Sequence, residues 1–261
     1  MEKAEFRDGA ITLYCGDMFD ILPTLDIEAD AVISDPPFGI TACEWDVVPP
    51  LDSLWEMLDN KTKPQANFVM FAAGGFTVDL INSKRNWYRY DLIWAKNNRV
   101  GFLNSNLMPL RAHESILVFG RPGFREAATY NPVKLQGGRP FTKTIKNRKA
   151  GIYPANDKAH TASSDGGINP CSILAFSNDR EGNQPEKCYH PTMKPLSLVG
   201  FLLMLYTQPG DLVLDMFMGS GTTAIACTKL NRRFIGCEKN PDYFQKSVRR
   251  IEESMWQKKA G

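Results

Sequence analysis

The sequence has no apolar run of membrane-spanning length and few residues suited to disulfide or metal chemistry. No stretch approaches the roughly 20 consecutive apolar residues of a transmembrane helix, and Met1 to Glu5 lacks the apolar centre of a signal peptide. The six cysteines form no Cys-x-x-Cys pair, and the three histidines match no zinc-finger spacing. We therefore expect a cytoplasmic protein with reduced thiols, no membrane contact and no bound metal.

Basic residues are nearly absent from the first 60 positions. Residues 1–60 carry 14 Asp or Glu side chains against only Lys3 and Arg7, a net charge of −12 in a chain whose total is +2. The remainder therefore stands at +14, and between 121 and 160 only Glu126 and Asp157 oppose the bases. Such a patch suits a polyanion such as nucleic acid, and a solvated face is the alternative. The bases of this patch are Arg121, Arg125, Lys134, Arg139, Lys143, Lys146, Arg148, Lys149 and Lys158.

Length and composition fit one large α/β domain that contains an insertion. At 261 residues and 43% hydrophobic content, the chain can form a single large core. Short apolar runs alternate with helical patterns before residue 120 and after 195, which predicts a mainly parallel sheet with helices on both faces. Residues 121–189 are instead polar, basic and rich in Gly, Pro and Asn. We predict that 1–120 and 190–261 are halves of one domain and that 121–189 is an insertion.

One predicted strand ends in Ser34-Asp35-Pro36-Pro37-Phe38. The preceding run Ala31–Ile33 is typical of a buried strand, and the two prolines end its ladder and stiffen the turn. Carbonyls before the prolines lose their strand partners and can point outward. A carboxylate and free carbonyls beside an aromatic ring could bind a planar group that carries an NH₂. The alternative is a rigid turn in which Asp35 caps a helix.

A glycine-rich stretch, Asp215 to Ala224, joins a later strand to a helix. Glycines allow the backbone to approach a ligand closely, and the helix N-terminus offers unpaired N–H groups to an anion. Glu238 ends the next strand, 19 residues after Gly219, where a carboxylate would meet ribose hydroxyls. No Gly-Lys-Ser/Thr follows, so this is not a P-loop. The spacing fits either NAD or an adenosyl sulfonium cofactor, and a plain strand–helix connection is the alternative.

These motifs and their order resemble the β subgroup of amino-group DNA methyltransferases, which use S-adenosylmethionine. In that family an Asp/Asn/Ser-Pro-Pro-Tyr/Phe motif precedes the cofactor loop, and a target recognition region lies between the two. This chain has Asp35–Phe38, then the basic 121–189 segment, then the loop that begins at Asp215. Three shorter matches accompany them: Gly16-Asp17, Arg111-Ala112-His113-Glu114, and His190–Pro195, which is similar to the family's His-Pro-Thr-x-Lys-Pro.

The resemblance implies a Rossmann-like, doubly wound, mainly parallel seven-stranded sheet in circularly permuted order. Residues 1–120 would be its catalytic half, 121–189 the target recognition region and 190–261 the cofactor-binding half. The implied activity is site-specific methylation, with S-adenosylmethionine as donor, of N6 of an adenine flipped out of double-stranded DNA, as in restriction-modification. A homodimer is also expected.

Two other activities remain as alternatives. N4-cytosine methylation uses the same motif class, although Ser is commoner there at the position of Asp35. An NAD-dependent oxidoreductase is the more distant alternative, because it would leave Asp35–Phe38 and the basic insertion unexplained.

The resemblance also assigns roles to single residues. Asp35 and the Pro36 carbonyl would accept hydrogen bonds from the target amino group, with Pro37 completing the motif. Phe38 would stack on the target base; the family usually has Tyr there, and Phe keeps the stacking face. Such a site needs no covalent nucleophile, because two acceptors out of the ring plane favour a more tetrahedral amine, and in-line positioning supplies much of the rest.

Cofactor and DNA contacts follow from the same resemblance. Asp17 is expected near the adenine of the cofactor and Glu238 at its ribose. Thr192 and Lys194 are expected at its methionine carboxylate. The full set of implied cofactor contacts is Asp17, Asp35, Thr192, Lys194, Asp215, Phe217, Gly219, Ser220, Gly221, Thr222, Thr223 and Glu238. The candidates for DNA contact are Arg99, Arg121, Arg125, Arg139, Lys143, Lys146, Arg148 and Lys149.

Three further expectations concern neighbouring segments. Carbon-5 cytosine methylation needs a cysteine after the cofactor loop, whereas Pro170-Cys171 precedes it, so we expect Cys171 in the core. Trp45 and Asp46 could close over a flipped base or anchor the loop after Phe38. Asn97–Pro109 is expected to be a long polar loop, either a DNA clamp or a plain surface loop.

Overall fold

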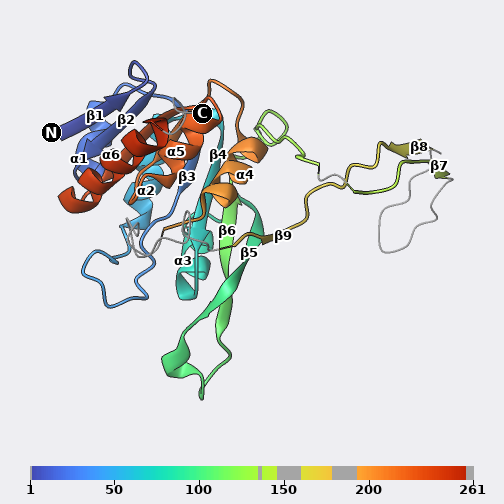
Figure 1. Ribbon diagram of the computed structural model, residues 1–261, viewed down its shortest axis with the longest axis horizontal. Helices are drawn as coiled ribbons and strands as arrows, with labels where there is room; N and C mark the ends of the chain where they lie inside the picture. The colour runs from blue at the N-terminus through green and yellow to red at the C-terminus, as the bar shows by residue number, and fades with distance from the viewer. Residues whose placement is uncertain (1, 135–136, 146–159, 178–192, 257–261) are drawn as a thin grey trace. The chain divides into compact units, whose positions relative to one another are not determined.

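The computed structural model of the chain describes residues 2–134, 137–145, 160–177 and 193–256 (Figure 1). The chain divides into two compact units: Met1–Asn131 with Ser172–Gly261, and Pro132–Cys171. The second unit is shorter than the predicted insertion 121–189, because residues 121–131 and 172–189 belong to the larger unit.

The larger unit is built on one nine-stranded sheet, in the order β1-β2-β11-β10-β3-β4-β6-β5-β9. The five strands from β2 to β4 in this order are parallel, β1, β6 and β5 join antiparallel to their inner neighbours, and β9 is parallel to β5. The strands are β1 Glu2–Phe6, β2 Ile11–Cys15, β3 Ala29–Ser34, β4 Thr62–Ala72, β5 Tyr88–Val100, β6 Arg111–Phe119, β9 Ile173–Ala175, β10 Leu212–Asp215 and β11 Arg233–Glu238.

The predicted α/β architecture is confirmed, but the sheet has nine strands within the described residues, where seven were predicted. The additional strands lie at the two edges. In β1, Glu2, Lys3 and Glu5 are exposed, so the strand carries no apolar run. The other edge strand, β9, comes from the segment predicted to be an insertion. An edge strand needs little apolar sequence, because backbone hydrogen bonds to one neighbouring strand keep it in the sheet even when its side chains are exposed.

Helices cover both faces of the sheet. Helices α1–α3 pack on Val32, Phe68 and Leu214 in one buried hydrophobic cluster. Ile33 and Val213, their neighbours along the strands, are equally buried outside that cluster, so the second face is covered as well. No helix in the described part of the chain is long and apolar enough to span a membrane. The helices are α1 Met18–Ile21, α2 Leu51–Lys61, α3 Gly75–Ser83, α4 Leu196–Tyr206, α5 Thr222–Lys229 and α6 Pro241–Trp256, with 3₁₀ turns η1 Leu22–Thr24 and η2 Phe102–Asn104.

Strands β5 and β6 form a long hairpin that continues past the rest of the sheet (Figure 1). β6 pairs with β4 only over Ser115–Phe119, whereas β5 and β6 still pair with each other at Val100 and Arg111. The predicted loop Asn97–Pro109 is therefore wrong in extent, since β5 runs to Val100. Polar residues are tolerated in this strand because the outer part of the hairpin is exposed.

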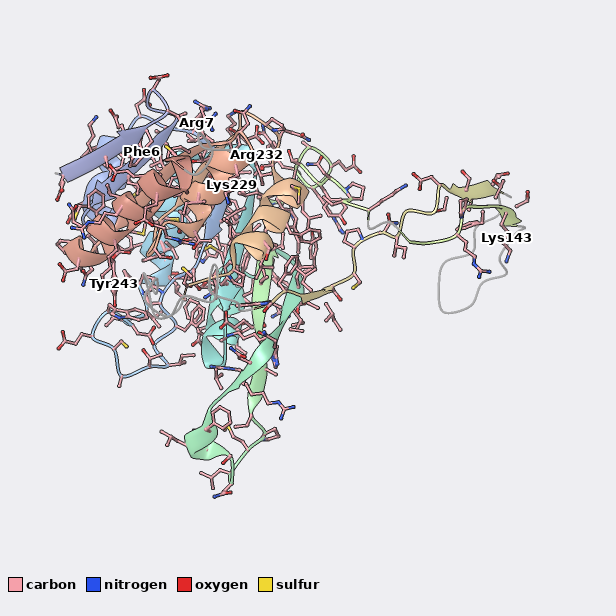
Figure 2. All side chains as sticks on the ribbon, viewed as in Figure 1. Phe6, Arg7, Lys143, Lys229, Arg232 and Tyr243 are labelled. Atoms are coloured by element: carbon pink, nitrogen blue, oxygen red, sulfur yellow. The ribbon has the colours of Figure 1, made fainter. Side chains whose placement is uncertain are left out.

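The smaller unit contains an antiparallel pair, β7 Phe141–Ile145 and β8 His160–Ser164. Within it the Gly138 N–H donates to the Gly166 carbonyl at 2.9 Å. Lys143 projects from β7 (Figure 2), and Arg139 is also exposed. Both stay predicted DNA contacts. The other candidates of this region, Lys146, Arg148 and Lys149, lie outside the described residues.

Candidate active site

The two predicted motifs meet at the carboxyl ends of adjacent parallel strands. β3 pairs directly with β10, so Ser34 at the end of β3 lies beside Asp215 at the end of β10. The Ser34 hydroxyl donates to Asp215 Oδ1 at 2.6 Å, across 181 positions of sequence. Asp35 follows immediately. The edge formed by these strand ends is where open α/β sheets hold their ligands.

Asp46 fixes the loop that follows the proline motif. Its buried carboxylate accepts four backbone N–H groups: those of Phe38 and Gly39 on Oδ1, at 2.8 and 2.9 Å, and those of Ile40 and Thr41 on Oδ2, at 2.9 and 2.7 Å. Burial alone would raise the pKa of Asp46, but the hydrogen bonds outweigh it and the pKa is lowered. Asp46 is thus the anchor of this loop.

Asp35 ends a buried chain of alternating charges. Lys194 Nζ lies 2.5 Å from Asp35 Oδ2 and 3.4 Å from Glu114 Oε2, and Lys96 pairs with the other oxygen of Glu114. Two cations thus balance two carboxylates, the condition under which buried charges persist. Asp35 Oδ1 is buried and has no hydrogen-bond partner among the described residues, so an acceptor remains free for a ligand.

The surroundings of Asp35 and Glu114 shift their pKa values in opposite directions. Burial raises the pKa of Asp35 to about 6, although the Lys194 ammonium opposes the rise. Burial also acts upward on the pKa of Glu114, but Lys194 and Lys96 outweigh it and hold this pKa below its usual value. Glu114 therefore stays ionised while Asp35 titrates close to neutrality.

The Phe38 ring is half-buried at the same place. It stacks on Phe76 with ring centroids 5.4 Å apart and an interplanar angle of 25°. Lys194 Nζ lies 5.5 Å from its centroid. Its stacking on a base stays a prediction.

The glycine-rich loop is organised by Asp215. Oδ2 of Asp215 accepts the Thr223 hydroxyl at 2.8 Å, and Oδ1 accepts the Phe217 N–H at 3.2 Å. Gly219 and Gly221 have φ of +50° and +72°, in the left-handed region, and a Cβ on Gly221 would lie 3.2 Å from the Ser247 Cβ of α6. Only glycine fits this turn without strain. Burial raises the pKa of Asp215 to about 6 against these hydrogen bonds.

Glu238 closes the other side of the glycine loop. Its Oε2 accepts the Gly219 N–H at 3.0 Å and its Oε1 accepts the Asn240 N–H at 2.8 Å. Each oxygen keeps a second lone pair for a ligand hydroxyl. Asp17 caps α1 by accepting the Phe19 N–H at 2.9 Å. Its other oxygen lies 3.0 Å from Lys239 Nζ.

A cavity of about 970 Å³ joins these groups. Both motifs and Glu238 line it, which brings together the residues predicted for catalysis and for cofactor binding. Tyr243 of α6 also lines it and is labelled in Figure 2. Thr192 lies outside the described residues. The remaining predicted contacts that line the cavity are Asp17, Lys194, Asp215, Phe217, Gly219, Ser220, Thr222 and Thr223.

The sequence did not predict three residues that support the site. Arg250 Nη1 of α6 donates to the hydroxyls of Ser220 and Thr222, at 3.1 and 2.8 Å. Glu114 had a signal, since it closes the family-like segment Arg111–Glu114 just before the apolar part of β6. Lys96 had none, because its contact with Glu114 depends on the pairing of β5 with β6.

Cys171 is exposed, so the prediction that it belongs to the core is wrong. The apolar run after it forms the edge strand β9, in which only Leu174 is buried.

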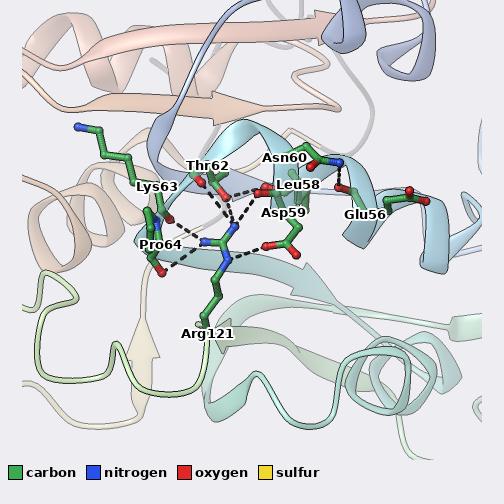
Figure 3. Close-up of polar contacts among 8 residues, drawn as sticks. All are labelled: Glu56, Leu58, Asp59, Asn60, Thr62, Lys63, Pro64 and Arg121. Atoms are coloured by element: carbon green, nitrogen blue, oxygen red, sulfur yellow. Dashed lines mark hydrogen bonds and ion pairs between the residues drawn. The ribbon is translucent and has the colours of Figure 1, made fainter.

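Arg121 has a structural role, which corrects its assignment to DNA contact (Figure 3). Its Nε donates to Asp59 Oδ1 at 2.7 Å, Nη2 donates to Thr62 Oγ1 at 2.9 Å, and Nη1 donates to the Lys63 carbonyl at 2.6 Å. The guanidinium carbon lies 4.9 Å from the Trp87 ring centroid. Arg121 thus ties the segment after β6 to the end of α2. Arg99 and Arg125 are exposed and stay predicted DNA contacts.

Arg121→Gln should lower the free energy of unfolding by about 2 kcal/mol, because the charge-assisted bond to Asp59 of α2 is lost and the partly buried acceptors of Thr62 and Lys63 lose a donor. Urea denaturation would measure it. Arg125→Gln, an exposed arginine four residues away, should change stability by less than about 0.5 kcal/mol. Equal effects of the two substitutions would contradict the structural role.

Sequence comparison places this chain among DNA-modifying enzymes. The model of a DNA methylase family matches residues 29–249. Type II methyltransferase M.HindIII of Haemophilus influenzae is 34% identical over 155 residues, which are 59% of this chain and 44% of that protein. The chain thus spans less than half the length of that relative. Type II methyltransferase M1.MboII of Moraxella bovis is 28% identical over 244 residues, covering 88% of this chain and 90% of that protein.

Solved structures agree with this assignment. The M1.HpyAVI–SAM complex has a TM-score of 0.61 at 25% identity and covers 92% of this chain and 99% of that chain. The PvuII DNA methyltransferase, described as cytosine-N4-specific, has a TM-score of 0.63 at 19% identity, covering 94% and 90%, a likeness of fold alone. Because the family model spans most of the sequence, the chain belongs to the N6/N4 DNA methylase family.

Proposed function

We propose that this chain transfers a methyl group from S-adenosylmethionine to N6 of an adenine flipped out of double-stranded DNA. The observation that carries the proposal is the shared cavity, in which the Ser34–Asp215 hydrogen bond holds the proline motif beside the glycine loop. The proposal includes a permuted fold, with 1–120 as catalytic half, 121–189 as target recognition region and 190–261 as cofactor half. The family match gives no support to the NAD alternative.

The residues of the cavity fit the cofactor. Glu238 has acceptor capacity left for two ribose hydroxyls, and Gly219, which lines the cavity, has no side chain to keep a ligand from its backbone. When bound, S-adenosylmethionine supplies an activated methyl group. We assign Asp17 to the adenine side. Lys194 was predicted at the methionine carboxylate, but its contact with Asp35 supports a role as partner of the catalytic carboxylate.

The chain's own groups would prepare the target nitrogen. An exocyclic amine is a poor nucleophile because its lone pair is delocalised into the ring. The unpartnered Oδ1 of Asp35 and the Pro36 carbonyl would accept its two N–H groups out of the ring plane, which favours an attacking lone pair. Asp35 could then hold the proton that the methylated nitrogen loses. Phe38 would support the base through its ring face.

Product analysis tests this proposal. Purified protein would be incubated with methyl-labelled cofactor and unmethylated plasmid DNA, followed by nucleoside chromatography. We expect N6-methyladenine, and methylome mapping of an expressing host would give its sequence context. The choice of adenine rests on Asp35. N4-methylcytosine as the sole product would therefore change the proposed target base to cytosine. Absence of both products would refute the function.

The rate should fall as pH drops through about 6, because the ionised form of Asp35 accepts the hydrogen bonds and burial raises its pKa to about 6. Lys194→Met removes the cation that lowers this pKa, so the acidic limb of kcat/KM should move to higher pH. Lys229→Met, at an exposed lysine of α5, is the control and should leave the limb in place. A limb unmoved by Lys194→Met would contradict the proposed pairing.

Glu238→Gln should weaken binding of S-adenosylmethionine by about 10–100-fold, because an NH₂ would face the donors of Gly219 or Asn240 and an acceptor for ribose is lost. Isothermal titration calorimetry would measure the affinity. Glu252→Gln, on the exposed side of α6, is the matched control. Unchanged affinity in Glu238→Gln would remove this residue from the cofactor site.

A further inference from the structure

The tip of the β5–β6 hairpin carries exposed apolar side chains that the fold does not use. Phe102 is 67% exposed, Leu107 84% and Met108 60%, and Leu103 is fully exposed. All residues from 101 to 109 are exposed. Scattered exposed hydrophobics are ordinary on protein surfaces, but four within seven residues mark a contact site.

The hairpin connects this tip to the active-site cavity. Val100 and Arg111 face each other in register at the outermost pair of the two strands, and both line the cavity. Further in, Trp94, Lys96 and Glu114 of the same strands line it too. The apolar residues begin two positions after Val100, so the tip extends directly from the wall of the cavity.

The charge of residues 92–113 indicates which kind of molecule the hairpin tip would contact. From 92 to 113 there is no Asp or Glu, while Lys96, Arg99 and Arg111 are basic. Arg99 is exposed just before the tip, and three asparagines lie in or next to it at 98, 104 and 106. Exposed bases suit phosphates and amides suit base edges, whereas apolar side chains in DNA-bound proteins insert between base steps.

We propose that Phe102, Leu103, Leu107 and Met108 form a wedge that enters the duplex beside the flipped base and fills the space it leaves. The inference rests on the proposed function, since that function requires a base to leave the stack. Unstacking a base costs a few kcal/mol, and apolar atoms in the vacated space recover part of that cost. Arg99 would hold the neighbouring phosphate.

Binding to a duplex with a missing base tests the wedge without any need for turnover. Fluorescence anisotropy would compare two labelled duplexes of one sequence, one intact and one with a central tetrahydrofuran abasic site. The wild-type chain should bind the abasic duplex about tenfold more tightly, because the cost of opening the stack is already met. The Phe102→Ala/Leu103→Ala double variant should bind both duplexes with nearly equal affinity.

Matched variants separate the wedge from other roles. Arg99→Gln should weaken both duplexes equally and keep their ratio, since a phosphate contact does not sense the missing base. Val78→Ala, an apolar residue of α3 that is 57% exposed, should behave as wild type. Because the tip residues are exposed, thermal unfolding of the double variant should match that of the wild type.

Three results would overturn the wedge: no abasic preference in the wild type, an unchanged ratio in the double variant, or conversion of a dimer to a monomer by the double substitution. The last, measured by light scattering, would make the tip a contact between two copies. Labelled methyl transfer by the wild type, assayed in parallel, keeps the two proposals apart. Abasic preference without transfer would refute the function and leave the wedge standing.

Discussion

Asp35→Ala should lower the rate of methyl transfer by a factor on the order of 10²–10³, and leave the affinity for S-adenosylmethionine within about threefold of wild type. The carboxylate is the acceptor proposed to face the target amine, and its Oδ1 has no partner among the described residues. An acceptor that acts mainly when charge develops on nitrogen contributes to turnover more than to binding. Removing it still leaves Lys194 with Glu114 as an ion partner, so the Lys194 ammonium is not left without a counter-charge.

Single-turnover transfer to plasmid DNA and calorimetry with the cofactor would measure the two quantities separately. Asp26→Ala replaces an exposed aspartate that precedes the same strand, and should match the wild type in both. Equal loss of transfer and cofactor affinity in Asp35→Ala would indicate a collapsed cavity, and wild-type transfer would refute the assigned role.

Asp46→Ala should reduce the rate of methyl transfer by about 10²-fold, because the loop that carries Phe38 would be displaced. Four backbone N–H groups, those of residues 38–41, lose their common acceptor. Unpaired donors favour conformations in which water reaches them, so the loop should leave its present geometry.

Hydrogen exchange read by mass spectrometry would follow the peptide that contains residues 38–41, where protection should be lost. Asp52→Ala, at an exposed aspartate in the first turn of α2, is the control and should change neither exchange nor transfer. Retained protection with normal transfer in Asp46→Ala would show that the loop holds its shape without this carboxylate.

Sequence reasoning succeeded where the signal was local. The proline motif, the glycine-rich loop and Glu238 were all predicted as strand-end features, and β3, β10 and β11 end at these positions. It failed for segments with a strand neighbour on one side only. β1 has too little apolar sequence to be recognised, and β9 is only three residues long. The outer part of the β5–β6 hairpin is polar because it is exposed.

The arginines show the same limit. Arg121 and Arg125 were assigned together from the charge of their segment. Only the packing of α2 against the start of that segment distinguishes them, because it surrounds the Arg121 guanidinium with acceptors.

By itself, the sequence determined the family resemblance and most of the motif residues that line the cavity, because proline, glycine and carboxylate chemistry acts within a few positions of a strand end. The tertiary structure alone decided how those residues are held. Lys194 meets Asp35 across 159 positions, and Ser34 meets Asp215 across 181. Such contacts depend on strand order, which a local pattern does not encode. The sequence thus predicted a role for Asp35. Its contact with Lys194, which also pairs with Glu114, depends on the packing of β3, β6 and the segment before α4.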